Sequence, residues 1–137
     1  MQVTIPPEAF LYCYSTNGGP RFRAAMASFI NEHFNPFIPI TDSQVLAGGG
    51  VTSNENMIAF SIGDPGDGIL VSGPIYGRFE LDFGSEARLK IVYAQMEGVD
   101  PFDVHAVDQF EKAIIDAEKN GTKIKALLIS NPSNPLG

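Results

Sequence analysis

Three short segments of the sequence combine residue types that could bind a flat, phosphorylated ligand. The first is a run of three glycines, residues 48–50, followed by Val51 and Thr52. If a helix begins there, its unpaired backbone N–H groups and the positive end of its dipole would attract a phosphate. The run matches neither GxGxxG nor the P-loop pattern, so these residues alone favour an ordinary turn between a strand and a helix.

The other two segments could supply an aromatic ring and an amide. Tyr76 follows the apolar residues 69–72, and ligands of α/β sheets gather just past the carboxyl ends of strands. Its ring could stack on a heterocycle or could equally face the core from a helix.

Asn134 lies in Asn-Pro-Ser-Asn-Pro-Leu-Gly, residues 131–137, directly after the apolar run 124–129. Two prolines stiffen this loop, so the amide could donate to a phenolate oxygen or could serve only the turn.

The segments that must position these residues alternate between helical and strand patterns. Strands are predicted at residues 44–47, 69–72, 89–93 and 124–129, the last with both faces covered by helices. Four helices are predicted: one from Pro20, one after a Thr52–Glu55 capping box, one around residues 74–84 and one from Asp103 to Asn120. The first has an apolar face formed by Phe22, Ala25, Met26, Phe29 and Ile30. The last has an apolar stripe formed by Val104, Val107, Phe110, Ile114 and Ala117. The sequence Asp-Pro-Gly-Asp at residues 64–67 predicts a turn. This alternation predicts an α/β domain with a mostly parallel sheet.

Composition and charge narrow the class of protein. The 137 residues suit one domain, and 44% apolar with 18% charged residues is typical of a globular chain. A net charge of −7 argues against nucleic acid or an anionic membrane as a partner. No apolar run approaches the roughly 18 residues of a membrane span, and the N-terminus shows no secretory signal.

Cysteine and histidine provide no catalytic or metal-binding pattern. Because Cys13 is the single cysteine, an internal disulfide is excluded, which fits a reducing, cytoplasmic environment. Its side chain is best interpreted as a small buried group. His33 and His105 lack partners at metal-ligand spacing, so we expect no metal site. The sequence also contains no Ser/His/Asp or Cys/His arrangement.

In their order along the chain, these segments resemble the aminotransferase class I/II family of fold-type-I pyridoxal-phosphate (PLP) enzymes. Within that family they are most similar to 1-aminocyclopropane-1-carboxylate (ACC) synthase-like proteins. The resemblance rests on residues 14–23, 47–55, 64–67, 74–76 and 131–137, and so covers nearly the whole chain. It implies that residues 1–137 are part of the large PLP-binding domain, with its mostly parallel, three-layer sheet.

Carried over by position, the resemblance implies a role for five residues. Gly50 and Val51 would donate backbone N–H groups to the PLP phosphate. The family usually has a hydroxyl residue where Val51 stands, and Thr52 could substitute for it. Tyr76 would stack on the pyridine ring, and Asn134 would hydrogen-bond the ring hydroxyl oxygen.

The resemblance also implies groups that would follow Gly137. Family members use a lysine that holds the cofactor covalently, an aspartate at the pyridinium nitrogen and an arginine for the substrate carboxylate. The lysines of this chain lie outside any such motif: Lys90, Lys112, Lys119, Lys123 and Lys125. We therefore expect an incomplete large domain that is inactive and folds poorly by itself.

The complete protein is expected to be a homodimer that acts on an amino acid, by transamination or by elimination, in biosynthesis. Residues 80–86 depart from the arginine-rich segment of ACC synthases. Two alternatives remain at this point. One is a non-catalytic remnant that serves as a dimerisation or interaction module. The other is an unrelated nucleotide-binding α/β module, which the absence of GxGxxG disfavours.

Overall fold

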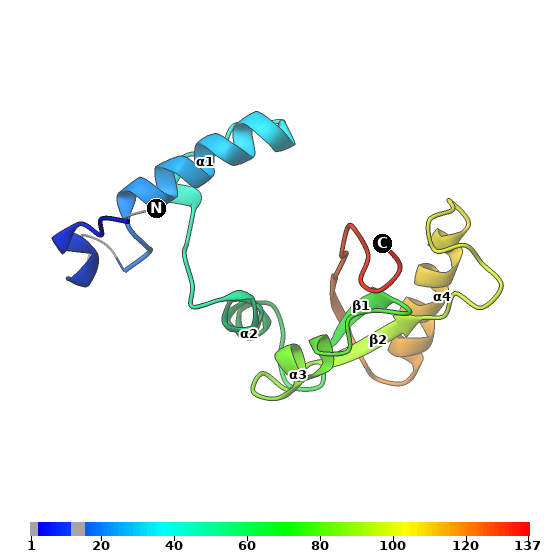
Figure 1. The fold of residues 1–137 in the computed structure, drawn as a ribbon. Helices are drawn as coiled ribbons and strands as arrows, with labels where there is room; N and C mark the ends of the chain where they lie inside the picture. The colour runs from blue at the N-terminus through cyan, green and yellow to red at the C-terminus, as the bar shows by residue number, and fades with distance from the viewer. Residues whose placement is uncertain (1–2, 12–15) are drawn as a thin grey trace. The chain divides into compact units, whose positions relative to one another are not determined.

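The computed structural model describes residues 3–11 and 16–137, so the prediction for Cys13 lies outside the described residues. The chain forms two compact units, Met1–Gly50 and Val51–Gly137 (Figure 1). The first contains the 3-10 helices η1 (Pro7–Phe10) and η2 (Asp42–Gln44) and the helix α1 (Pro20–Phe34). The second contains α2 (Val51–Ile62), β1 (Gly68–Ser72), α3 (Phe79–Gly84), β2 (Lys90–Ala94), α4 (Ala106–Lys119) and β3 (Ile124–Leu127).

In the first unit, α1 confirms the helix predicted from Pro20. Proline suits the first helical position because its missing N–H has no intrahelical partner there. The helix ends at Asn35, whose φ of 44° gives a left-handed cap. Its predicted apolar face is not buried, since Phe22 and Phe29 are exposed and Ala27 is the buried residue. Within this unit, α1 packs against η2.

The strand predicted at residues 44–47 is wrong. Asp42–Gln44 forms η2, and the Thr41 N–H donates to Oε1 of Gln44 at 2.9 Å. Val45 is extended, and the Ala47 N–H donates to the Asn17 carbonyl at 3.0 Å. A strand needs a neighbour with a continuous ladder of hydrogen bonds. The single bond from Ala47 to Asn17 does not form such a ladder.

The second unit is organised around a three-stranded parallel sheet with the order β2-β1-β3. In the register between β1 and β2, Gly68 lies opposite Lys90 and Ser72 lies opposite Ala94. On the other side, Leu70 lies opposite Leu127 of β3. The three strands predicted here are therefore confirmed, and so is their parallel arrangement.

Helices cover both faces of β1. Ile69 and Val71 pack with Ala59 of α2 and Phe83 of α3. Successive side chains of a strand point to opposite faces, so Leu70 points to the other side, where α4 packs along all three strands (Figure 1). The predicted α/β fold class is confirmed. Among the described residues, no helix is both long enough and apolar enough to cross a bilayer.

The turn between α2 and β1 is confirmed in detail. The Asp67 N–H donates to the Asp64 carbonyl at 3.0 Å, and Gly66 has a φ of 96°. The Asp67 carboxylate accepts the Asp64 N–H at 2.9 Å and lies 3.4 Å from Nζ of Lys125 in β3. The hydrogen bond from Asp64 and the Lys125 ammonium hold the pKa of Asp67 below its ordinary value. This turn therefore ties the start of β1 to β3.

Two predictions about helix α4 and strand β3 need correction. Asp103 does accept the His105 N–H at 2.8 Å, but it caps a turn and α4 begins only at Ala106. Val104 and Val107 of the predicted stripe are exposed. The strand β3 is half-buried rather than covered on both faces, because it lies at one edge of the sheet.

Two isoleucines with different burial should differ in how much each contributes to the free energy of unfolding. The Ile69 side chain is 1% exposed in β1, whereas Ile115 of α4 is 49% exposed. In the complete protein, Ile69→Ala should lower the free energy of unfolding by about 2–5 kcal/mol, because it removes buried methyl groups and leaves a cavity. Urea denaturation would measure this loss. The control Ile115→Ala should stay within about 0.5 kcal/mol of wild type; equal losses would contradict the assignment of the core.

Candidate functional site

Tyr76 lies in the loop that leaves the carboxyl end of the central strand. The loop is anchored on both sides of this residue, because Ile75 and Phe79 pack against the core. The rings of Tyr76 and Phe79 meet edge to face, with centroids 5.4 Å apart and an interplanar angle of 84°. The side chain of Tyr76 is 45% exposed and precedes α3, so it does not face the core from within a helix. A ring held in this way can present an open surface to a flat ligand.

The conformationally free glycine Gly50 directly precedes Val51, where helix α2 begins. Gly50 has a φ of 126°, and a Cβ atom there would meet no heavy atom within 4 Å. Val51 is the first residue of α2 and is exposed, as is Thr52. The predicted capping box is therefore wrong, since Thr52 lies within the first turn of α2. The backbone N–H groups of that turn have no partner within the helix, which suits them to an anion.

The loop after β3 carries Asn134 at the same edge of the sheet as Tyr76. The Leu128 N–H still donates to the Leu70 carbonyl at 2.9 Å, so the loop starts beside the end of β1. The Gly137 N–H donates to the Ser133 carbonyl at 2.8 Å and closes a turn around Asn134. The Asn134 side chain is exposed and makes no hydrogen bond to the residues that the structure describes. Its amide is therefore free to bind a ligand group.

A cavity of about 490 Å³ lies between this loop, the end of β1 and the start of α4. Its polar lining comes from Ser72, Ser130, Asn131 and Ser133, and its apolar lining includes Phe102. Neither Tyr76 nor Asn134 lines this cavity. The structure thus brings the two loops to one edge of the sheet, although the cavity there is lined by neither of the two predicted side chains.

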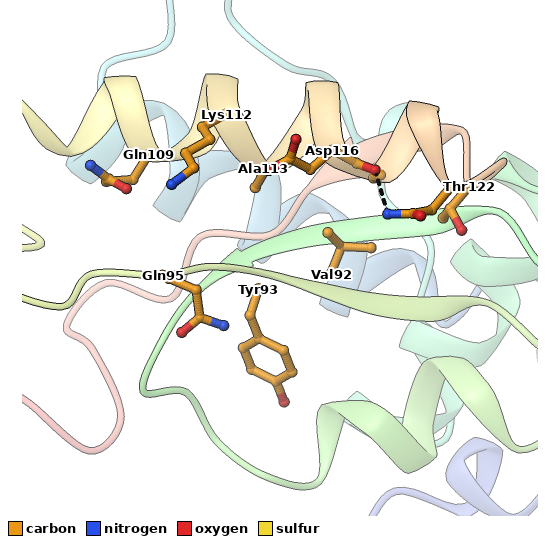
Figure 2. Close-up of a pocket in the computed structure, with 10 residues that line it drawn as sticks. Val92, Tyr93, Gln95, Gln109, Lys112, Ala113, Asp116 and Thr122 are labelled. Carbon is orange, nitrogen blue, oxygen red and sulfur yellow. Dashed lines mark hydrogen bonds between the residues drawn. The ribbon is translucent and has the colours of Figure 1, made fainter.

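A second cavity, of about 420 Å³, lies between β2 and α4. Figure 2 shows Gln109, Lys112 and Asp116 on the side of α4 that faces Val92 of β2. Sequence reasoning did not identify these residues, although their spacing of three and four positions along α4 places them on one helical face. Within the part of the chain that the structure describes, no three His, Cys, Asp or Glu side chains are grouped so that they could hold a metal ion.

Tyr93 of β2 is linked to helix α3 by a short hydrogen bond. Its hydroxyl donates to Oε1 of Glu80 at 2.7 Å. Figure 2 shows its ring directed away from α4. The bond to Glu80, followed by partial burial, raises the pKa of Tyr93 above its ordinary value of 10.0.

Comparisons with known proteins agree on one family. The family model described as aminotransferase class I and II matches residues 8–137. ACC synthase 1 of Prunus mume is 34% identical over 121 residues, which are 88% of this chain and 24% of that protein. The probable aminotransferase tcpI of Claviceps purpurea is 32% identical over 130 residues, which are 95% of this chain and 30% of that protein. The chain thus spans about a quarter to a third of these curated relatives.

Solved structures show the same fold. An archaeal alanine:glyoxylate aminotransferase superposes with a TM-score of 0.71 and 24% identity, covering 88% of this chain and 28% of its own. Bna3p, a putative kynurenine aminotransferase from Saccharomyces cerevisiae, superposes with a TM-score of 0.69 and 21% identity. That match covers 95% of this chain and 30% of the yeast chain.

The contact between Tyr93 and Glu80 can be tested by titration. An ionised tyrosine beside a carboxylate is disfavoured, so Tyr93 should lose its proton above pH 10.0. Glu80→Gln should move this step to lower pH, and ultraviolet absorbance of tyrosinate would follow it. Subtraction of the Tyr93→Phe titration assigns the step to this residue. An unchanged Tyr93 step in Glu80→Gln would show that the hydrogen bond does not form in solution.

Proposed function

The chain belongs to the aminotransferase class I and II family, and we propose that it forms one side of the cofactor site of a PLP-dependent enzyme. Members of this family are PLP-dependent. The observation that carries the proposal is the position of Tyr76, a half-exposed ring braced by Phe79 at the carboxyl end of the central parallel strand. That edge is where α/β sheets bind their ligands.

The residues present fit the cofactor in three places. The first turn of α2, from Val51, offers backbone N–H groups to the phosphate, and the Thr52 hydroxyl can add a donor. Gly50 has no side chain, and no heavy atom lies close to it, so the backbone can approach the phosphate closely there. Its positive φ is a conformation that glycine adopts easily. Tyr76 stacks on the pyridine ring, and the free amide of Asn134 donates to the ring oxygen.

When bound, PLP supplies an electron sink that stabilises negative charge on an amino acid. The residues of this chain bind and orient the cofactor rather than carry that chemistry. The lysine that attaches the cofactor, the aspartate at the ring nitrogen and the substrate arginine would be supplied by sequence beyond Gly137. By this proposal, residues 1–137 are part of the large domain and are inactive alone. The complete protein is a cytoplasmic homodimer that acts on an amino acid by transamination or elimination.

Replacing Tyr76 tests the assignment of the stacking ring. In the complete protein, Tyr76→Ala should raise the dissociation constant for PLP by roughly two- to twelvefold, from about 0.5–1.5 kcal/mol of stacking beyond area burial. Absorbance titration of the cofactor-free protein would measure it. Tyr76→Phe keeps the ring and should bind nearly as wild type does. An unchanged affinity in Tyr76→Ala would exclude this residue from the site.

The transcript beyond the codon for Gly137 tests whether the chain belongs to an enzyme. The reading frame should continue and encode a strand ending in aspartate, then a lysine in a serine-rich stretch, then arginines. These groups are needed together with Asn134 for the proposed chemistry. Sequencing of full-length transcripts would check this. A stop codon after Gly137 in a translated transcript would instead favour a non-catalytic interaction module.

A further inference from the structure

Glu55 is the only charged residue of α2, and its carboxyl group is placed where a negative charge is costly. Its Oε2 atom is buried and has no hydrogen-bonding partner that could stabilise an ionised carboxylate. Burial of a charge without a donor or a counter-ion is unfavourable, so such a group tends to keep its proton. A neutral carboxylic acid, in contrast, can donate one hydrogen bond.

Asp82 of α3 is the carboxyl group whose charge acts on Glu55. The helices α2 and α3 pack together, and the Asp82 side chain is only 3% exposed. Its Oδ1 lies 3.3 Å from Nε of Arg78, the N-cap residue that precedes α3. One guanidinium therefore compensates one carboxylate. Two neighbouring carboxyl groups repel each other strongly if both ionise. Because the buried Oε2 of Glu55 has no donor, Glu55 is the group placed to hold a proton.

The titration of Glu55 follows from these surroundings. Burial, the hydrogen bond with Asp82 and the charge of Asp82 all raise the pKa of Glu55 above 4.5. The folded protein thus holds this proton over a pH range in which the unfolded chain has lost it. The stability linked to the neutral acid is fully present below pH 4.5 and is lost as the pH rises through the raised pKa. Two further charges lie near this site. Arg78, the N-cap residue of α3, pairs with Asp82, and Glu80 of α3 accepts a hydrogen bond from the hydroxyl of Tyr93 in β2.

We propose that Glu55 is a positioning residue that donates its proton to Asp82 and thereby fixes the start of α2 relative to the loop that carries Tyr76. Glu55 lies one helical turn after Val51, so it is coupled to the proposed phosphate-binding end of α2. Asp82 lies one turn after Arg78 and shares α3 with Phe79, which braces the Tyr76 ring. This inference rests on the proposed function, because it assigns the bond a role in shaping the PLP site.

The test compares three forms of the complete protein: wild type, Glu55→Gln and Glu55→Leu. The dissociation constant for PLP is measured by absorbance between pH 5 and pH 9. Glutamine can still donate to Asp82 but cannot ionise, so Glu55→Gln should match wild type at low pH. As the pH rises, binding by wild type should weaken by roughly fivefold or more relative to Glu55→Gln, in the range typical of coupled sites. Dividing the two constants cancels the ionisation of PLP itself.

Glu55→Leu preserves the volume of the side chain but cannot donate, so it should bind PLP more weakly than Glu55→Gln at every pH. Equal affinities of these two variants, or a pH-independent ratio of wild type to Glu55→Gln, would overturn the positioning role. If Glu55→Leu does not fold, the ratio between wild type and Glu55→Gln still decides the question.

Infrared difference spectroscopy of the cofactor-free protein separates this inference from the proposed function. Wild type minus Glu55→Gln should show the carbonyl band of a protonated carboxylic acid above pH 4.5, and the band should disappear as the pH rises through the raised pKa. Its absence below the raised pKa would contradict the shared proton whether or not PLP binds. Failure of all three forms to bind PLP, with the band present, would instead contradict the proposed cofactor site.

Discussion

The parallel pairing of β1 on both sides is the constraint on which the second unit depends. The backbone of β1 is hydrogen-bonded to β2 and to β3, while Ile69 and Val71 on one face and Leu70 on the other are buried. Because all three strands run in one direction, their carboxyl ends meet at one edge. The loop with Tyr76 and the loop with Asn134 must therefore begin side by side. The place where ligands can bind is a consequence of strand direction, before any side chain is considered.

The helices on either side of the sheet are fixed by different kinds of contact. The α4 helix lies along the sheet with small buried residues, Ala106 and Ala117. The α2 and α3 helices meet through the apolar pair Ala59 and Phe83 and also through a buried carboxyl. Apolar contacts tolerate small shifts, whereas a hydrogen bond weakens within a few tenths of an ångström. A polar bond in this layer therefore defines orientation more sharply than packing alone.

Local chemistry in the sequence was sufficient to predict most elements but not their surroundings. Pro20 and the Asp64–Asp67 turn act through backbone preferences of a few residues, and both predictions were confirmed. The strand at residues 44–47 was predicted wrongly because strand formation depends on a distant partner. For the site, Tyr76 could be placed at the end of a strand from sequence. The interaction of Glu55 with Asp82 could not be predicted from the sequence, because Asp82 lies in another helix. In addition, the spacing between Thr52 and Glu55 resembles that of a capping box.

The register of the sheet also sets an order of difficulty for assembly. Gly68 pairs with Lys90, from which it is separated along the chain mainly by α3. Its partner in β3, Ile124, is much further along the chain, beyond β2 and α4. Loop-closure entropy rises by about 0.6 kcal/mol for each doubling of loop length. The parallel β1–α3–β2 crossover thus has the lower contact order, and docking of β3 carries the larger loop-closure cost. The loop of Asn134 is consequently attached to the strand whose pairing is slowest to form.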